Sequence, residues 1–430
     1  MKNFTLLKAR LRNMMKLTLL LLTITGYTAT AQDFWEQVDN CGGGLIFDIL
    51  VDPQGRIYLA RHGATSGGVC RSDDNGLTWQ AKNNGFLFPT VRSITFKPDS
   101  TLFVSVDYGV YRSRDLGENW QLVYDAMQES WQYSTIEYGY DSVLLVSGGR
   151  ENGILRSTDD GETWEVVLNL YNSDYWEYVT DILFGPGNVI YACSTFTNNW
   201  SNENPKVYYS TDFGKTWAVL LDPQEPAGFF TLAFNNAGKL MAGGYDAIYT
   251  YDFNTGIWNY DAYNTIVSDF LVLPDNRIFM AGDDSGAGWG GVALSEDDGA
   301  TFPTVLNSGL IINCAIRLAV DKPGRILMHD FYFLNRSIDT IVTGIEKYPD
   351  AHQSFVSCYP NPFGNSVRFQ SMYPSVLKAE LYGMAGNYIK SFEIPPLGEY
   401  RLDTGTLPAG MYFVKLQSGN NIQTIKLIHY

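Results

Sequence analysis

The chain has 430 residues, a formal net charge of −16 at pH 7 and a high content of glycine and aromatic residues. This length exceeds one ordinary domain, although a propeller or barrel built from repeats can hold most of it in one body. A protein this acidic repels phosphate backbones and anionic lipid surfaces, and we therefore expect no nucleic acid partner.

The N-terminus is basic and then apolar, as in a secretory leader. Residues 17–24 form a short apolar stretch after Lys16, and a small-x-small cleavage pattern ends at Ala31. This pattern predicts a signal peptide over residues 1–31, too short to be a membrane span. We expect a secreted mature chain without a transmembrane segment. The start codon is left open among three methionines, Met1, Met14 and Met15.

The cysteines are odd in number and follow no metal-type spacing. We therefore expect no disulfide framework, despite the oxidising compartment that the leader implies, and neither a metal site nor a cofactor. Two of them, Cys193 and Cys314, lie in apolar runs and are predicted to be small buried side chains. The full set is Cys41, Cys70, Cys193, Cys314 and Cys358.

One short pattern, Ser-x-Asp-x-Gly-x-x-(Trp/Phe), recurs along the chain. Around each copy, four alternating apolar runs are bounded by Gly, Pro and Asp, which predicts four short antiparallel strands. Four-stranded units repeated roughly every 40 to 50 residues are propeller blades. Two degenerate copies, around Asp252 and Asp339, bring the number of units to seven. The aspartates of the complete copies are Asp74, Asp115, Asp159, Asp212 and Asp297.

The seventh unit lacks a fourth strand of the usual kind. The segment Phe34–Val38 resembles the strand that follows the third copy, residues 163–167. We predict that residues 33–39 complete the last blade beside residues 331–343. This pairing would close the ring and remove an exposed sheet edge.

The repeated motif has the chemistry of a tight hairpin turn. Its Asp can accept hydrogen bonds from its own turn, its Gly takes a positive φ, and its Trp packs between blades. A catalytic acid or calcium ligand is not needed in every blade, so we interpret these aspartates as structural. The motif resembles the Asp box of sialidases and related BNR-repeat propellers, over about residues 33–345. That resemblance implies that the boxes lie on the face away from the functional site.

The loops predicted for the opposite face are aromatic and acidic. Flat rings beside carboxylates and amides are typical of a sugar-binding surface, and rings that merely support the loops are the alternative. The candidate ligand-binding residues are Trp131, Tyr175, Trp176, Glu177, Trp200, Asp283 and Trp289. We assign no catalytic residue, because sialidase-type catalysis requires three arginines on a substrate carboxylate and few arginines can face the channel. These are chiefly Arg61, Arg92, Arg150 and Arg317.

After about residue 345 the repeat stops, and residues 346–354 are predicted to be a linker. Residues 355–430 open with Tyr359-Pro360-Asn361-Pro362 and contain a Leu-Pro-Ala-Gly-x-Tyr-Phe-Val run that begins at Leu407. Alternating apolar runs with Pro and Gly turns predict a small antiparallel β-sandwich. The segment resembles the type A C-terminal sorting domain of type IX secretion. The resemblance implies recognition by that machinery, with release or attachment at the cell surface; a carbohydrate-binding sandwich is the alternative.

The sequence thus predicts an all-β chain, with a seven-bladed Asp-box β-propeller over residues 32–345 followed by a small C-terminal antiparallel β-sandwich. We expect a monomeric, secreted or surface-attached recognition propeller that binds glycans or surface polymers without catalysis. One alternative is a glycoside hydrolase, sialidase-like or xyloglucanase-like, acting on the same face. The other is a scaffold propeller that binds protein partners.

Overall fold

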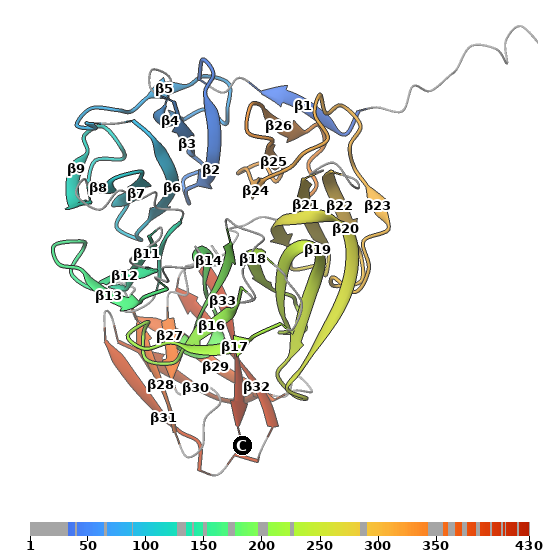
Figure 1. Cartoon of the computed structure of the whole chain (residues 1–430). Coiled ribbons are helices and arrows are strands. Elements are labelled where there is room, and N and C mark those ends of the chain that lie inside the picture. The colour runs from blue at the N-terminus through green and yellow to red at the C-terminus, as the bar shows by residue number, and fades with distance from the viewer. Residues whose placement is uncertain are drawn as a thin grey trace, which may run out of the picture.

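The structure is a computed structural model of the whole chain (Figure 1). It describes residues 33–38, 41–63, 67–87, 89–126, 135–139, 142–148, 153–170, 177–196, 205–223, 228–283, 290–342, 356–359, 366–371, 376–383, 388–395, 398–405, 407–408, 410–418 and 421–429.

The first part of the chain forms a ring of antiparallel sheets whose inner strands surround a common axis, the region called the channel below (Figure 1). In each of the first four blades, strand order follows sequence order from the channel outward. Alternating apolar residues form these strands, and the turns between them contain Gly, Pro and Asp. The strands are β2 (Leu45–Val51), β3 (Ile57–His62), β4 (Gly68–Ser72), β5 (Gln80–Ala81); β6 (Val91–Phe96), β7 (Leu102–Val106), β8 (Gly109–Ser113), β9 (Gln121–Asp125); β10 (Ile136–Tyr138), β11 (Leu144–Ser147), β12 (Ile154–Ser157), β13 (Glu165–Leu168); and β14 (Glu177–Phe184), β15 (Ile190–Phe196), β16 (Val207–Ser210), β17 (Ala218–Leu221).

Blades 5 and 6 share one six-stranded sheet, because two strands are long enough to serve two positions each. The strand β19 pairs with β18 up to Gly244 and with β20 from Tyr245 onward. A positive φ of 56° at Asp246 marks the bend between the two halves. The later part of β20 then pairs with β21 as the inner strand of blade 6. The strands are β18 (Phe229–Phe234), β19 (Leu240–Asp252), β20 (Ile257–Val272), β21 (Ile278–Asp283), β22 (Gly291–Ser295) and β23 (Thr304–Val305).

The seventh blade is closed by the N-terminal segment, as predicted. Its strands are β24 (Arg317–Val320), β25 (Ile326–His329), β26 (Leu334–Ser337) and, outermost, β1 (Trp35–Val38). The register joins Trp35 to Ser337 and Val38 to Leu334. The Trp35 ring is buried, and its Nε1 donates a hydrogen bond to the Leu306 carbonyl of blade 6. The described residues therefore form a closed ring of seven blades.

A disulfide links Cys41 to Cys70, so the expectation of no disulfide framework was wrong for this pair. Cys41 follows the closing strand β1, whereas Cys70 lies in β4 of blade 1. Cys41 lies in the loop between β1 and β2, which carries no repeated motif, and its pairing with a strand of blade 1 leaves no signal in the sequence. Cys193 and Cys314 are buried free thiols, as predicted.

The propeller core lies between blades and not at the centre of the ring. One apolar cluster, for example, joins Tyr58 and Val69 of blade 1 to Val91 and Leu102 of blade 2. The apolar side chains pack between neighbouring sheets. The channel is therefore lined by the inner strands and their polar residues. No helix in the described part of the chain is long and apolar enough to cross a membrane.

The C-terminal strands form a small sandwich with its own apolar core, as predicted. One sheet contains β27 (Val356–Tyr359), β28 (Ser366–Ser371) and β31 (Glu399–Asp403). The other contains β30 (Tyr388–Ile394), β29 (Leu377–Gly383), β32 (Gly410–Ser418) and β33 (Asn421–His429). Phe369, Leu381 and Val414 are among the core residues. The strand β27 lies against a short 3-10 helix of blade 4, η2 (Pro186–Asn188). The predicted segment bounds at 31, 345 and 354 remain predictions.

Candidate functional site

The carboxylate of each complete Asp box accepts hydrogen bonds from within its own turn. In blade 1, Asp74 Oδ1 accepts hydrogen bonds from Ser72 Oγ and the Thr78 amide, and Asp74 Oδ2 accepts one from the Thr78 hydroxyl. The bonds from Thr78 lower the pKa of Asp74 to about 2. Gly76 has a φ of 83°, and its amide donates to Ser72 Oγ. The same bonds recur at the other complete boxes, those of Asp115, Asp159, Asp212 and Asp297.

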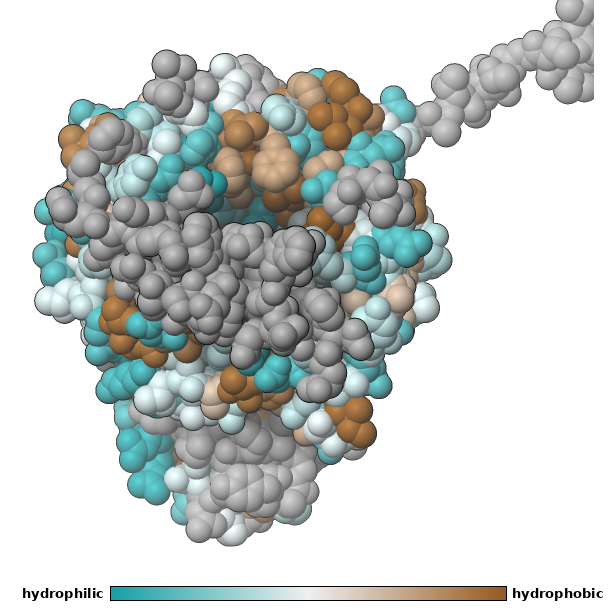
Figure 2. All heavy atoms as spheres, viewed as in Figure 1, coloured by the Kyte–Doolittle hydropathy of each residue, from teal (hydrophilic) through white to brown (hydrophobic). Residues whose placement is uncertain are grey.

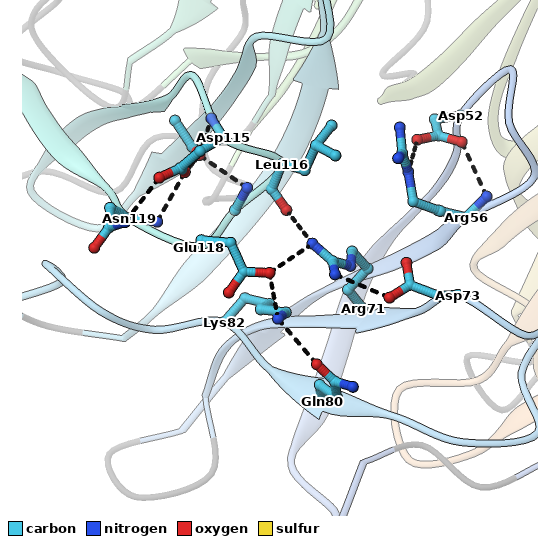
Figure 3. A network of polar contacts seen from close by, with 12 residues as sticks. Asp52, Arg56, Arg71, Asp73, Gln80, Lys82, Asp115, Leu116, Glu118 and Asn119 are labelled. Atoms are coloured by element: carbon cyan, nitrogen blue, oxygen red, sulfur yellow. Dashed lines mark hydrogen bonds and ion pairs between the residues drawn. The ribbon is translucent and has the colours of Figure 1, made fainter.

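An arginine that precedes the box serine latches one blade to the next. Arg71 donates to the Leu116 carbonyl in the box of blade 2 and pairs with Glu118, as Figure 3 shows. Arg112 makes the same contact with the Asp160 carbonyl and Glu162 of blade 3. The other latch arginines are Arg156, which donates to Phe213 O, and Arg336, which donates to Asn75 O. These four arginines thus link neighbouring blades on the Asp-box face.

At the inner strands, three aspartates project toward the channel and connect neighbouring blades by hydrogen bonds. Each sits at a β-bulge, and one of its oxygens accepts a backbone N–H from the next blade. Asp48 Oδ2 accepts from Ile94 N at 3.0 Å, Asp181 Oδ2 from Leu232 N at 2.8 Å, and Asp269 Oδ2 from Leu318 N at 2.7 Å. These carboxylates therefore have a structural role at the channel wall.

Two longer side chains break this pattern, Glu137 in blade 3 and Arg317 in blade 7. Arg317 Nη1 lies 3.7 Å from Asp269 Oδ1, and 27% of the Arg317 side chain is exposed. Burial, together with the charges of Asp181 and Asp48, raises the pKa of Glu137 well above its ordinary value. At Asp269, the effect of burial outweighs that of the positive charge of Arg317, and the pKa of Asp269 is raised to about 7. The channel thus holds four carboxyl groups around one guanidinium, a polar and acidic interior.

A compact cluster lies at the mouth of the channel, on the face opposite the Asp boxes. We define the mouth cluster as Phe47, His62, Arg92, Asp107 and Phe331. Arg92 Nε donates to Asp107 Oδ1 at 2.8 Å, and His62 Nε2 lies 3.4 Å from Asp107 Oδ2. The Arg92 guanidinium carbon lies 4.7 Å from the centre of the Phe47 ring. Phe331 packs edge-on against Phe47, with ring centres 6.0 Å apart.

The mouth cluster draws on three consecutive blades, 7, 1 and 2. Phe47 and Arg92 occupy the bulge positions immediately before Asp48 and Ser93, where the strand turns a side chain out of the ladder. Tyr108 and Tyr332, next in sequence to Asp107 and Phe331, are 42% and 57% exposed. Figure 2 shows a hollow beside β2 and β24, with hydrophilic atoms on its floor and hydrophobic residues on its rim. Aromatic surface next to a few fixed polar groups is typical of a ligand site.

Of the predicted ligand-binding residues, the structure describes Glu177 and Asp283. Glu177 is buried, and its Oε1 accepts hydrogen bonds from Ser194 Oγ at 2.6 Å and Tyr208 OH at 2.8 Å. Asp283 ends β21 and forms a β-bridge with Cys314, away from the mouth cluster in sequence and blade. The remaining candidates, Trp131, Tyr175, Trp176, Trp200 and Trp289, lie outside the described residues.

Sequence reasoning missed most of the mouth cluster. Arg92 was among the arginines expected near the channel, but Phe47, His62, Asp107 and Phe331 were not singled out. A β-bulge cannot be recognised within a run of alternating apolar and polar residues. In the sequence, Phe47 and Arg92 therefore resemble ordinary strand residues. Within the described part of the chain, no group of three His, Cys, Asp or Glu side chains is placed to hold a metal ion.

Comparisons with known families match a segment in each of the two parts of the chain. Residues 357–429 match the secretion system C-terminal sorting domain, and residues 208–218 match the BNR/Asp-box repeat. No curated protein sequence matches significantly. The match to the sorting domain indicates secretion to the cell surface or the extracellular space.

Solved structures share the fold at low sequence identity. PorZ, described as a surface component of the type IX secretion system of Porphyromonas gingivalis, has a TM-score of 0.56 and 16% identity over 93% of this chain. This chain covers 60% of PorZ. YCF48 bound to a D1 peptide has a TM-score of 0.54 and 14% identity, over 72% of this chain and 96% of YCF48. A virginiamycin B lyase variant from Staphylococcus aureus has a TM-score of 0.54 and 15% identity, over 71% of this chain and 98% of the lyase.

These likenesses support the fold alone, because every identity is below 25%. The sorting domain and the repeat are supported separately, by the family matches at residues 357–429 and 208–218. The chain is an Asp-box β-propeller protein of the BNR-repeat type that carries a C-terminal type IX secretion sorting domain.

Proposed function

We propose that this surface propeller is a recognition protein that binds a glycan or surface polymer at the mouth cluster, without catalysis. The observation that carries the proposal is the convergence of Phe47, His62, Arg92, Asp107 and Phe331 from three blades. It brings aromatic rings, hydrogen-bond donors and a carboxylate acceptor into mutual contact. Sugar rings present apolar C–H faces and hydroxyl edges, and such a surface is complementary to both.

The exposed tyrosines extend this surface. Tyr108 and Tyr332 flank the mouth cluster on blades 2 and 7, and each leaves about half of its side chain accessible. Rings carried by blades 2 and 7, on either side of blade 1, stand on a rigid scaffold, so that little conformational entropy is lost on binding. A polymer that crosses the mouth would contact both rings at once.

The state of the channel carboxylates favours binding over hydrolysis. A glycosidase needs two carboxyl groups about 5 to 9.5 Å apart that can reach the scissile bond. Asp48, Asp181 and Asp269 are occupied by backbone N–H groups of the neighbouring blades. Glu177 is buried and accepts bonds from Ser194 and Tyr208. These four carboxylates are thus engaged in hydrogen bonds within the protein.

A glycan array with variants on and off the site tests the proposal. Combined replacement of Tyr108 and Tyr332 by Ala should weaken binding at least tenfold. Stacking of a sugar on an aromatic ring contributes on the order of 1 kcal/mol per ring. Tyr260→Ala is the matched control, because Tyr260 is 57% exposed on the outer strand of blade 5. Equal binding by the double variant and the control would contradict the proposed face.

A second measurement addresses catalysis. Each bound oligosaccharide is incubated with the full chain, and new reducing ends are quantified. We expect binding without new reducing ends. Turnover that disappears in Glu137→Gln while binding persists would favour the hydrolase alternative.

A further inference from the structure

We propose that the ligand carries a carboxylate, which is received by the outward Nη1/Nη2 edge of Arg92. This inference rests on the proposed function and deepens it, because it names the class of glycan as an acidic polysaccharide built with uronic acids. Arg92 is then the residue that determines specificity for the charged sugar over its neutral counterpart.

Arg92 is held in one orientation by its surroundings. Its Nε donates to Asp107 Oδ1 at 2.8 Å, and its guanidinium lies over the Phe47 ring at 4.7 Å. Phe47 is itself held by Phe331 and by His62, whose ring centre lies 5.5 Å away. Only 16% of the Arg92 side chain is exposed. A guanidinium fixed in this way can bind a planar carboxylate with little further loss of side-chain entropy.

The outward edge of Arg92 is unused within the described part of the chain. The Nε side of the guanidinium donates to Asp107, and neither Nη atom has a hydrogen-bond partner among the described residues. Two parallel N–H groups at this edge match the two oxygens of a carboxylate. A half-buried guanidinium with a free donor pair is costly unless water or a ligand occupies it.

The other arginines near the channel cannot take this role. Arg61 Nη1 donates to the carbonyls of Cys41 and Gly43, where it supports the loop after the closing strand. Arg317 interacts with Asp269, Asp181, Asp48 and Glu137, so a further anion there would be repelled. Arg150 lies outside the described residues. Arg92 is therefore the candidate that geometry favours.

The acidity of the protein does not oppose this contact at short range. At physiological salt the Debye length is about 8 Å, so charges on distant blades are largely screened. In the channel, Arg317 offsets part of the negative charge, and burial raises the pKa of Asp269 to about 7, which leaves it partly neutral at neutral pH. Asp107 lies at the Nε side of Arg92, and it is shared with His62.

Isothermal titration with paired polymers tests the inference. The probes are polygalacturonate and the same polymer fully methyl-esterified, which keeps the sugar backbone and removes the charge. The full chain should bind the acid form at least tenfold more tightly, and Arg92→Gln should abolish that difference. Arg92→Lys keeps the charge but loses the paired donors, and we expect it to retain only part of the preference. Arg114→Gln is the matched control, because Arg114 is exposed in an Asp-box turn on the opposite face.

The outcomes separate this inference from the function on which it rests. Equal affinity for both polymers, or equal losses in Arg92→Gln and Arg114→Gln, overturns the carboxylate inference and leaves glycan binding intact. No binding to either polymer or to any glycan of the array overturns the proposed function itself. Thermal unfolding of each variant checks the fold, and Arg92→Lys decides the question if Arg92→Gln is unstable.

Discussion

Replacing Arg112 by Met should destabilise the propeller, because it removes the latch between blades 2 and 3. The Arg112 side chain is 3% exposed, and its Nη1 donates to the Asp160 carbonyl and to Glu162 Oε1, each at 2.7 Å. Its Nη2 donates to Gln121 Oε1 at 3.0 Å. Met keeps most of the apolar stem, so the change acts chiefly on these hydrogen bonds.

The magnitude follows from burial. A buried acceptor left without its donor costs about 1 to 3 kcal/mol. The pair with Glu162 adds about 0 to 1 kcal/mol, because that carboxylate is 59% exposed. We therefore expect a loss of about 1 to 4 kcal/mol. With an unfolding entropy of about 2.1 cal/mol/K per residue over residues 33–342, this loss lowers Tm by about 2 to 6 °C.

Thermal and urea unfolding of the native chain and the variant measure this loss. Arg114→Gln is again the matched control, since Arg114 is exposed in the neighbouring box and is expected to leave Tm unchanged. An Arg112→Met variant as stable as the control would refute the argument that these arginines hold adjacent blades together.

Three further predictions follow from the ring. Replacing Cys41 and Cys70 by Ser should cost about 3 to 4 kcal/mol for a sequence separation of 29, and only the native chain should lose stability on adding a reductant. Removing residues 33–38 should expose the edge of β26, which size-exclusion chromatography would detect as self-association. Because the pKa of Asp269 is raised in the folded state to about 7, folding binds a proton between pH 4 and 7, and stability should fall as pH rises through that window. Its contribution is at most about 1.4 kcal/mol per pH unit, and the slope should be shallower in Asp269→Asn; an unchanged slope would show that other groups dominate.

Repetition made the architecture predictable from the sequence. The Ser-x-Asp-x-Gly pattern encodes a local turn whose bonds lie within five residues, as the Asp74 turn illustrates. Local patterns of this kind can be read without knowledge of the fold. The N-terminal strand was predictable for the same reason, since Phe34–Val38 repeats the pattern of an outer strand and fits the one vacancy in blade 7.

Contacts between segments far apart in the sequence were not predictable. Cys41 meets Cys70 once blade 1 has folded, and Arg112 meets the carbonyl of Asp160 once blades 2 and 3 lie side by side. The mouth cluster likewise depends on bulges that turn Phe47 and Arg92 toward the channel. No local pattern distinguishes these residues from their neighbours in a strand. The loops at Trp131, Trp176 and Trp200 keep their predicted ligand role as a hypothesis.

Hydroxyl-radical footprinting with a saturating glycan most directly tests the claim that recognition occurs at the channel mouth. Tyr108 and Tyr332 report on the mouth, whereas Phe253 and Tyr260, also well exposed, report on the outer part of blade 5. We predict that the ligand protects the first pair and leaves the oxidation of the second pair unchanged. Protection of Phe253 and Tyr260 without protection of Tyr108 and Tyr332 would contradict the account.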